Sequence, residues 1–183
     1  MTMTISVLPT ADDRRTNASF EELMWAISRP GLVRGMPFAG FEALAESLID
    51  RECTFHASLD PALDERIART GARRAAVEKA DYVFAPLGGE TEVAALSQMR
   101  IGTLSYPDES STLFAPAIIG TGQALRLIGP GIKGEIFLRI GGVHPSFWAM
   151  RAKAIRYPLG WELYLVDGDR LVGIPRTTKI EVL

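Results

Sequence analysis

The residues best suited to chemistry lie near the carboxyl end of the sequence, in Arg176-Thr177-Thr178. Pro175 precedes them and cannot donate to a β-ladder, so we expect the ladder to be interrupted there. A forked guanidinium, two hydroxyls and freed backbone N–H groups suit an oxyanion, or a carboxylate on a partner. Glu162 belongs to the same candidate contact set. The alternative is a hairpin tail in which Arg176 pairs with a surface acid.

These candidates follow a predicted β-hairpin. Residues 161–166 alternate as a strand does, and Leu171–Ile174 returns as the second strand. Asp167-Gly168 supplies the turn between them, because Gly adopts positive φ without steric cost. The hairpin therefore places the candidate residues just beyond the end of its second strand.

A glycine-rich stretch earlier in the chain has the spacing of a dinucleotide-binding loop. It reads Gly129-Pro130-Gly131-Ile132-Lys133-Gly134. Pro130 removes a backbone donor that a pyrophosphate loop uses, and residues 135–140 alternate like a strand where the motif needs a helix. The stretch therefore predicts a turn, and we expect no cofactor there.

Metal and acid–base chemistry receive little support from the sequence. Cys53 and His56 are three residues apart, but on a strand these positions point to opposite faces. The only other histidine is His144, which leaves too few ligands for a closed zinc site. Asp108-Glu109 lies in a polar loop and is interpreted as a solvated turn. We expect no metal and no catalytic residues.

Composition excludes several classes of protein. The 183 residues are 47% hydrophobic and 23% charged, with a formal net charge of −2 and dispersed basic residues, so we expect no nucleic-acid binding. The single cysteine indicates a reducing compartment. No stretch reaches the roughly 20 apolar residues of a membrane span, and the first 15 residues hold no apolar signal region. We expect a cytoplasmic protein without membrane contact.

Strand and helix patterns are interspersed, which predicts one α/β domain over residues 1–183 with a mixed sheet. Residues 1–16 are interpreted as a loose arm, followed by a helix that Asn17 or Ser19 caps and that Phe20, Leu23, Met24 and Ile27 line with an apolar stripe. Gly120-Thr121-Gly122 predicts a hairpin or tight connection. Further helices are expected at 41–50, 60–70, 90–99 and 145–156, and further strands at 53–58, 82–86, 113–119, 124–128 and 135–140.

Four ordered segments together resemble the H-subunit family of bacterial carbon–phosphorus lyase. Residues 20–31, F-E-E-L-M-W-A-I-S-R-P-G, resemble the family's F-R-x-L-L-x-A-M-S-x-P-G. Gly102-Thr103 with P-D-E-S-S-T-L at 107–113 resembles G-T … P-E-x-G-A-T-L, and L-I-G-P-G-I at 127–132 resembles L-x-G-x-G-I. The most specific segment is the tail, Y-P-L-G-W-E … I-P-R-T-T-K-I-E, which resembles F-P-L-G-x-D … I-P-R-T-T-x-V-E. Departures from the pattern are Glu21 for Arg, Asp108 for Glu, Ser110-Ser111 for Gly-Ala and Glu162 for Asp.

The resemblance implies a part in phosphonate breakdown. In that pathway the subunits join an alkylphosphonate to the ribose of ATP, and a separate radical iron–sulfur subunit later breaks the C–P bond. It implies a non-catalytic homodimeric subunit that joins the other core subunits, with phosphonate or ATP as ligands of the complex. It also implies a fold similar to the pyridoxal-phosphate-dependent transferases without the cofactor site. The alternative is a small enzyme that binds a nucleotide or phosphonate at Arg176-Thr177-Thr178.

Overall fold

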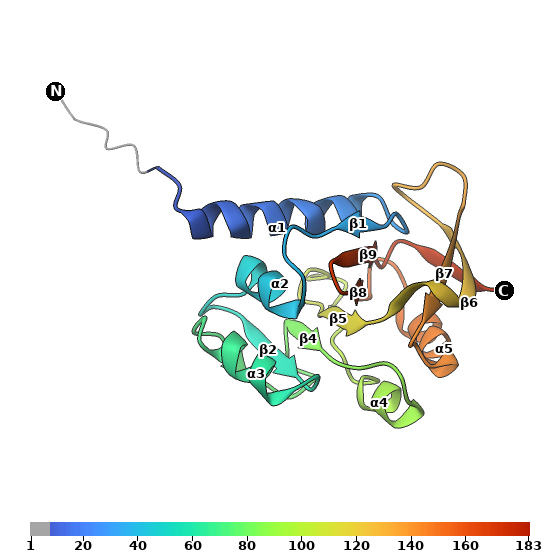
Figure 1. Cartoon of the computed structure of the whole chain (residues 1–183). Coiled ribbons are helices and arrows are strands. Elements are labelled where there is room, and N and C mark those ends of the chain that lie inside the picture. Colours follow the sequence, from blue (N-terminus) through green and yellow to red (C-terminus); the bar gives the residue numbers. More distant parts are fainter. Residues whose placement is uncertain (1–7) are drawn as a thin grey trace.

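The computed structural model describes residues 8–183, which form an α/β domain with a mixed sheet (Figure 1). This confirms the predicted fold class. The helices are α1 Ala11–Ser28, α2 Phe41–Leu48, α3 Pro61–Ala68, α4 Glu90–Ala95 and α5 Pro145–Ala154. The strands are β1 Arg34–Gly35, β2 Thr54–Ala57, β3 Arg73–Arg74, β4 Tyr82–Phe84, β5 Thr112–Pro116, β6 Ile118–Ile128, β7 Ile136–Gly141, β8 Glu162–Asp167, β9 Arg170–Ile174 and β10 Lys179–Val182.

The main sheet has seven strands in the order β1-β9-β8-β5-β4-β2-β3. Strands β3, β2, β4, β5 and β8 run parallel, while β9 and β1 are antiparallel to their neighbours. The antiparallel β8–β9 pair is the predicted hairpin. Its ladder closes at Asp167 and Arg170, so the two turn residues are Gly168 and Asp169, one position later than expected. Gly168 adopts φ +63°, as the turn requires.

Both faces of this sheet are buried. Along β8, Leu163 and Leu165 pack into the core beneath α4 and α5, while Tyr164 and Val166 pack into the core beneath α1, α2 and α3. On the second face, Tyr164 lies in a stack with the rings of Phe114 and Phe84, each pair 4.9 Å between centroids. The Tyr164 hydroxyl donates to the Leu23 carbonyl of α1 at 3.1 Å. This bond ties the first helix to the middle of the sheet.

A second, antiparallel sheet has the order β10-β6-β7 and packs its apolar side against the core that α5 also covers. The hairpin or tight connection predicted at residues 120–122 is wrong, because β6 runs through these residues with a shift of register between Ile119 and Gln123. Gly122 makes this bulge possible: its φ is +73°, and an added Cβ would lie 2.5 Å from the Gly141 Cα of β7. The glycines thus permit a close strand approach where a chain reversal was expected.

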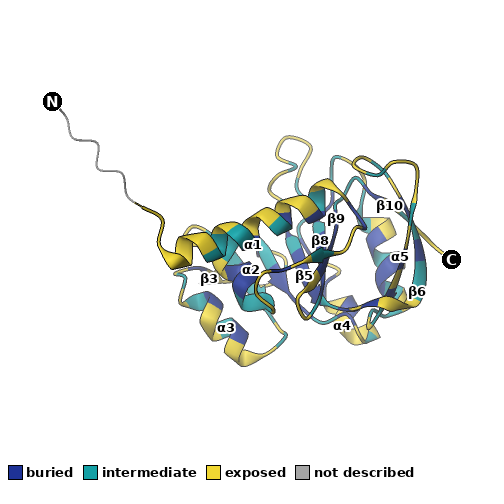
Figure 2. Cartoon of the chain, turned by 45° about the horizontal axis from the view of Figure 1, so that its top comes forward, coloured by how far each residue is buried: buried dark blue, intermediate teal, exposed yellow. Residues whose placement is uncertain are grey.

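The predicted loose arm extends too far along the chain. Helix α1 begins at Ala11, because the Thr10 hydroxyl accepts from the Asp13 N–H at 3.1 Å while the Asp13 carboxylate accepts from the Thr10 N–H at 2.8 Å. This capping box precedes the expected caps at Asn17 and Ser19. The part of the arm at residues 1–7 lies outside the described residues. Figure 2 shows that α1 buries one side only, with its outer side exposed.

The apolar stripe predicted on this helix is also partly wrong. Phe20 and Met24 are exposed, whereas Ser19, Leu23 and Ala26 are buried. The expected helices at 41–50, 60–70 and 145–156 are present with slightly shorter bounds, and the helix expected at 90–99 ends at Ala95. Strand β10 was not expected, since its residues read as a polar tail.

Candidate functional site

Arg176 and Glu162 lie in contact, with both groups largely buried. The Arg176 Nε donates to Glu162 Oε1 at 2.6 Å, and the main-chain N–H of Arg176 donates to Glu162 Oε2 at 2.8 Å. The carboxylate therefore holds both the side chain and the backbone of the arginine. Pro175 and Arg176 end the β9 ladder as the sequence predicted, but the freed main-chain donor is satisfied by Glu162.

The remaining Arg176 donors bind two other segments of the chain. Nη1 donates to the carbonyls of Pro107 and Pro158, and Nη2 donates to the Ser110 hydroxyl at 2.9 Å. The guanidinium is thus engaged on every nitrogen, and its charge is balanced by Glu162. Arg176 therefore pairs with an acid, as in the alternative, but that acid is the largely buried Glu162 and not a surface residue.

Thr177 and Thr178 follow Arg176 in the chain and line a groove. Thr178 is 2% exposed, and its N–H donates to the Pro175 carbonyl at 3.0 Å, which closes a turn over residues 175–178. Thr177 is partly buried. The structure therefore brings all four candidate residues into one region, where Arg176 and Glu162 form a largely buried ion pair and Arg176 lines the same groove as the two threonines.

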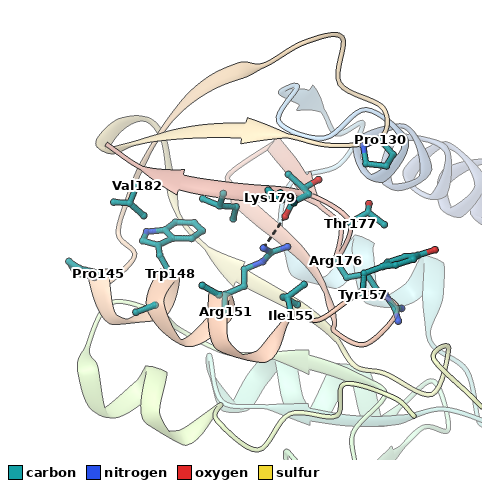
Figure 3. A pocket seen from close by; sticks show the side chains of 14 residues that line it. Pro130, Pro145, Trp148, Arg151, Ile155, Tyr157, Arg176, Thr177, Lys179 and Val182 are labelled. Atoms are coloured by element: carbon teal, nitrogen blue, oxygen red, sulfur yellow. Dashed lines mark hydrogen bonds between the residues drawn. The ribbon is translucent and has the colours of Figure 1, made fainter. Parts of the chain in front are cut away.

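The groove runs between α5 and β10 and has a volume of about 1010 Å³ (Figure 3). Arg151 rises from the middle of α5, with Trp148 toward one end of the groove and Tyr157 toward the other. The 14 residues that line it are Pro130, Pro145, Trp148, Ala149, Arg151, Ala152, Ile155, Tyr157, Arg176, Thr177, Thr178, Lys179, Ile180 and Val182.

Arg151 is the functional candidate that sequence reasoning missed. It is a charged residue of the helix expected at 145–156, yet it is only 3% exposed. Its Nη1 and Nη2 donate to the carbonyls of Thr178 and Pro175 at 3.3 and 2.8 Å, and the guanidinium lies 5.7 Å from the Trp161 ring. Burial lowers its pKa to about 10, against a smaller opposing effect of the Glu162 charge. Arg151 lies four residues after Phe147, so helical spacing could have placed it on the buried side.

The other sequence candidates do not form a site. Within residues 8–183 no group of three or more His, Cys, Asp or Glu side chains is placed to hold a metal ion. His56 lines a smaller pocket of about 410 Å³, and Cys53 packs at the edge of the core, where burial raises its pKa. Residues 129–132 form a turn closed by the Ile132 N–H and the Gly129 carbonyl, as predicted. No described helix is both long and apolar enough to cross a bilayer.

Similar proteins place this chain among known families. Residues 10–181 match the family described as bacterial phosphonate metabolism protein (PhnH). The chain is 33% identical over 173 residues to a Stutzerimonas stutzeri protein named "Putative C-P lyase subunit protein HtxG", with 92% of this chain and 87% of the relative covered. It is 31% identical over 181 residues to the Rhizobium meliloti protein named alpha-D-ribose 1-methylphosphonate 5-triphosphate synthase subunit PhnH, with 88% of each covered. The chain therefore belongs to the bacterial phosphonate metabolism protein (PhnH) family.

Proposed function

We propose that this protein is an accessory subunit of a carbon–phosphorus lyase system, and that it supports assembly of the complex that couples an alkylphosphonate to the ribose of ATP. The observation that carries the proposal is the family match over residues 10–181. The names of the two relatives, both given as subunits, support it further.

The geometry at Arg176 supports a structural role over an independent catalytic one. Its guanidinium joins the hairpin tail to residues 107–110 and 158, and its charge is balanced by Glu162. Lysine chemistry is not favoured either, because Lys79, Lys133, Lys153 and Lys179 are all exposed, and a Schiff-base lysine needs a desolvated or cationic setting to lower its pKa.

Three finer statements belong to the same proposal. The protein acts in the cytoplasm and forms a homodimer, for which the exposed Phe20, Met24 and Trp25 on α1 offer one apolar surface. Its fold is related to the pyridoxal-phosphate-dependent transferases without the cofactor site. Sedimentation tests the dimer. Added pyridoxal phosphate followed by borohydride should leave no lysine adduct at a single site, and a stoichiometric adduct would contradict the missing cofactor site.

Coexpression tests the main proposal. The protein, tagged and coexpressed with the other subunits of a carbon–phosphorus lyase system, should co-elute with them in size-exclusion chromatography. An unrelated protein with the same tag serves as the control. Elution of this protein apart from the other subunits, whether the tag is on this protein or on one of them, would remove the proposal's support. Turnover of ATP and methylphosphonate by the isolated chain would favour the enzyme alternative.

A further inference from the structure

The groove between α5 and β10 combines an apolar wall with positive charge. Trp148, Ile155, Ile180 and Val182 supply much of its apolar surface, and Arg151, Arg176 and Lys179 are its charged lining residues. No Asp or Glu is among the 14 lining residues. An occupant that matches this lining has an apolar body and a negative group.

The positive charge of Arg151 has no balancing carboxylate. Among residues 8–183, none of the ion pairs involves Arg151. The carbonyls of Pro175 and Thr178 accept two of its five N–H bonds, but carbonyls solvate a cation without neutralising it. The nearby Glu162 is bound to Arg176 through both oxygens. A buried charge without a counter-ion is costly, so an anion at this position would be favoured.

Unsatisfied polar atoms gather in the same wall. Arg151 Nε, Trp148 Nε1 and Thr178 Oγ1 are buried without a hydrogen-bond partner, and all three residues line the groove. Only two other side-chain atoms in the described part of the chain, Ser19 Oγ and Arg100 Nε, share this condition. Buried polar groups are usually paired, so their concentration here indicates that this wall carries polar groups without hydrogen-bond partners in the chain.

The size of the groove fits a small molecule. Ligand pockets commonly enclose roughly 300–1000 Å³, with mostly apolar walls and a few polar groups that orient the ligand. The volume of about 1010 Å³ lies at the upper end of this range. Figure 3 shows Arg151 midway along the groove, so an anionic group there would leave room for an apolar body toward Trp148 and Val182.

We propose that the α5–β10 groove binds an amphiphilic organic anion, with its negative group at Arg151 and its apolar body between Trp148, Ile180 and Val182. The negative group is placed at Arg151 and not at Arg176, whose charge Glu162 balances, and the inference does not depend on the proposed accessory function. The recognised chemistry is shared by a phosphonate and a carboxylate that carry an alkyl chain.

Calorimetric titration of the full chain tests this site with four probes: octylphosphonate, octanoate, the uncharged 1-octanol and methylphosphonate. Octylphosphonate should bind about 100-fold more tightly than methylphosphonate, because about half of its added methylene surface becomes buried. It should bind about tenfold more tightly than 1-octanol, because the guanidinium forms charge-assisted hydrogen bonds with the anion. Equal binding of octanoate indicates a general anion site, and preference for the phosphonate indicates selection within the same site.

Two variants with matched controls locate the binding. Arg151→Met should remove the tenfold preference for the anion over 1-octanol, whereas Arg139→Met, at an exposed position of β7 outside the groove, should retain it. Ala152→Phe fills the groove from an exposed position and should weaken octylphosphonate at least about tenfold. Lys153→Phe, the next exposed residue of α5 but outside the lining, should not weaken it.

A spectroscopic measurement on the wild-type protein tests the site without depending on the folding of any variant. In the wild-type protein the indole N–H resonance of Trp148, assigned with Trp148→Phe, should shift as octylphosphonate is added, because the side chain of Trp148 lines the groove. Absence of saturable binding by octylphosphonate and octanoate would overturn the proposal, as would unchanged binding in Ala152→Phe. Neither result bears on co-elution with other subunits, so the two proposals fail separately.

Discussion

Glu162 binds Arg176 through two hydrogen bonds, since one carboxylate oxygen accepts from the side-chain Nε and the other from the main-chain N–H. Glu162 begins β8, and Arg176 follows β9 by two residues. The pair therefore closes the open end of the hairpin, opposite its turn. Through Pro107 and Ser110 the same arginine also holds the loop before β5. The charges thus stabilise the junction of three segments.

Breaking this pair should lower the free energy of unfolding. We expect Arg176→Met to cost about 2–4 kcal/mol in urea denaturation, because it leaves a largely buried carboxylate without its charged partner. Arg126→Met is the control, since Arg126 pairs with Glu135 and Glu181 at the surface and should cost under about 1 kcal/mol. Adding Glu162→Gln to Arg176→Met should cost less than the sum of the single changes. Additive losses would contradict the pairing.

Gly102 should be far less replaceable than Gly120. Both have positive φ, +77° and +98°, but an alanine Cβ at Gly102 would lie 2.7 Å from the Pro107 carbonyl oxygen. At Gly120 nothing lies within 4 Å of that Cβ. We expect Gly120→Ala to cost about 1 kcal/mol for the backbone conformation alone, and Gly102→Ala at least about 2 kcal/mol more. Thermal and urea unfolding measure both, and equal costs would disprove the clash.

Stability should fall at acidic pH partly through Asp81. Burial raises its pKa, but hydrogen bonds from the Thr54 hydroxyl and N–H at 2.6 and 2.7 Å, with the Arg100 guanidinium, outweigh burial and bring the pKa below its ordinary 3.8. A carboxyl with a lowered pKa stabilises the fold above its unfolded pKa and loses that contribution as pH falls through the folded one. The stability difference between wild type and Asp81→Asn should therefore shrink below about pH 4. A difference that stays constant from pH 7 to pH 2 would refute this.

The start of α1 gives a fourth prediction. Thr10→Ala removes the hydroxyl that accepts from Asp13, so it should destabilise the protein by about 1 kcal/mol. Thr16→Ala, inside the same helix, should be neutral or slightly stabilising, because alanine is the better helix former. Urea unfolding should therefore show a lower free energy of unfolding for Thr10→Ala than for Thr16→Ala. A loss of stability in Thr16→Ala as large as in Thr10→Ala would argue against the cap.

Local signals in the sequence predicted much of this fold. The alternation along residues 161–166, the turn residues after it and the helical spacing in residues 145–156 each depend on near neighbours, and the corresponding elements are present. Gly120-Thr121-Gly122 misled for a physical reason: glycine allows both a turn and a close strand contact, and only the position of β7 decides between them.

The candidate site was harder to predict, because its contacts span long separations. The sequence indicated Arg176 as a cation near Glu162, but its bond to Pro107 crosses 69 positions. The type of residue alone gives no sign that Arg151 is buried, since a charged side chain is rarely buried without a partner. Its guanidinium binds the carbonyls of Pro175 and Thr178 in the turn that leads into β10, and no local pattern predicts the pairing of β10 with β6.

The Arg176 junction also determines how this protein can be recombined with its relatives. Residues 102–111 and 157–178 contact one another through the bonds from Arg176 to Pro107 and Ser110, and through the bond from the Glu162 N–H to the Ser111 carbonyl. A chimera that takes only the tail from a relative would place a foreign tail against this protein's own loop at residues 102–111. Exchanges that preserve folding should therefore transfer both segments together as one module.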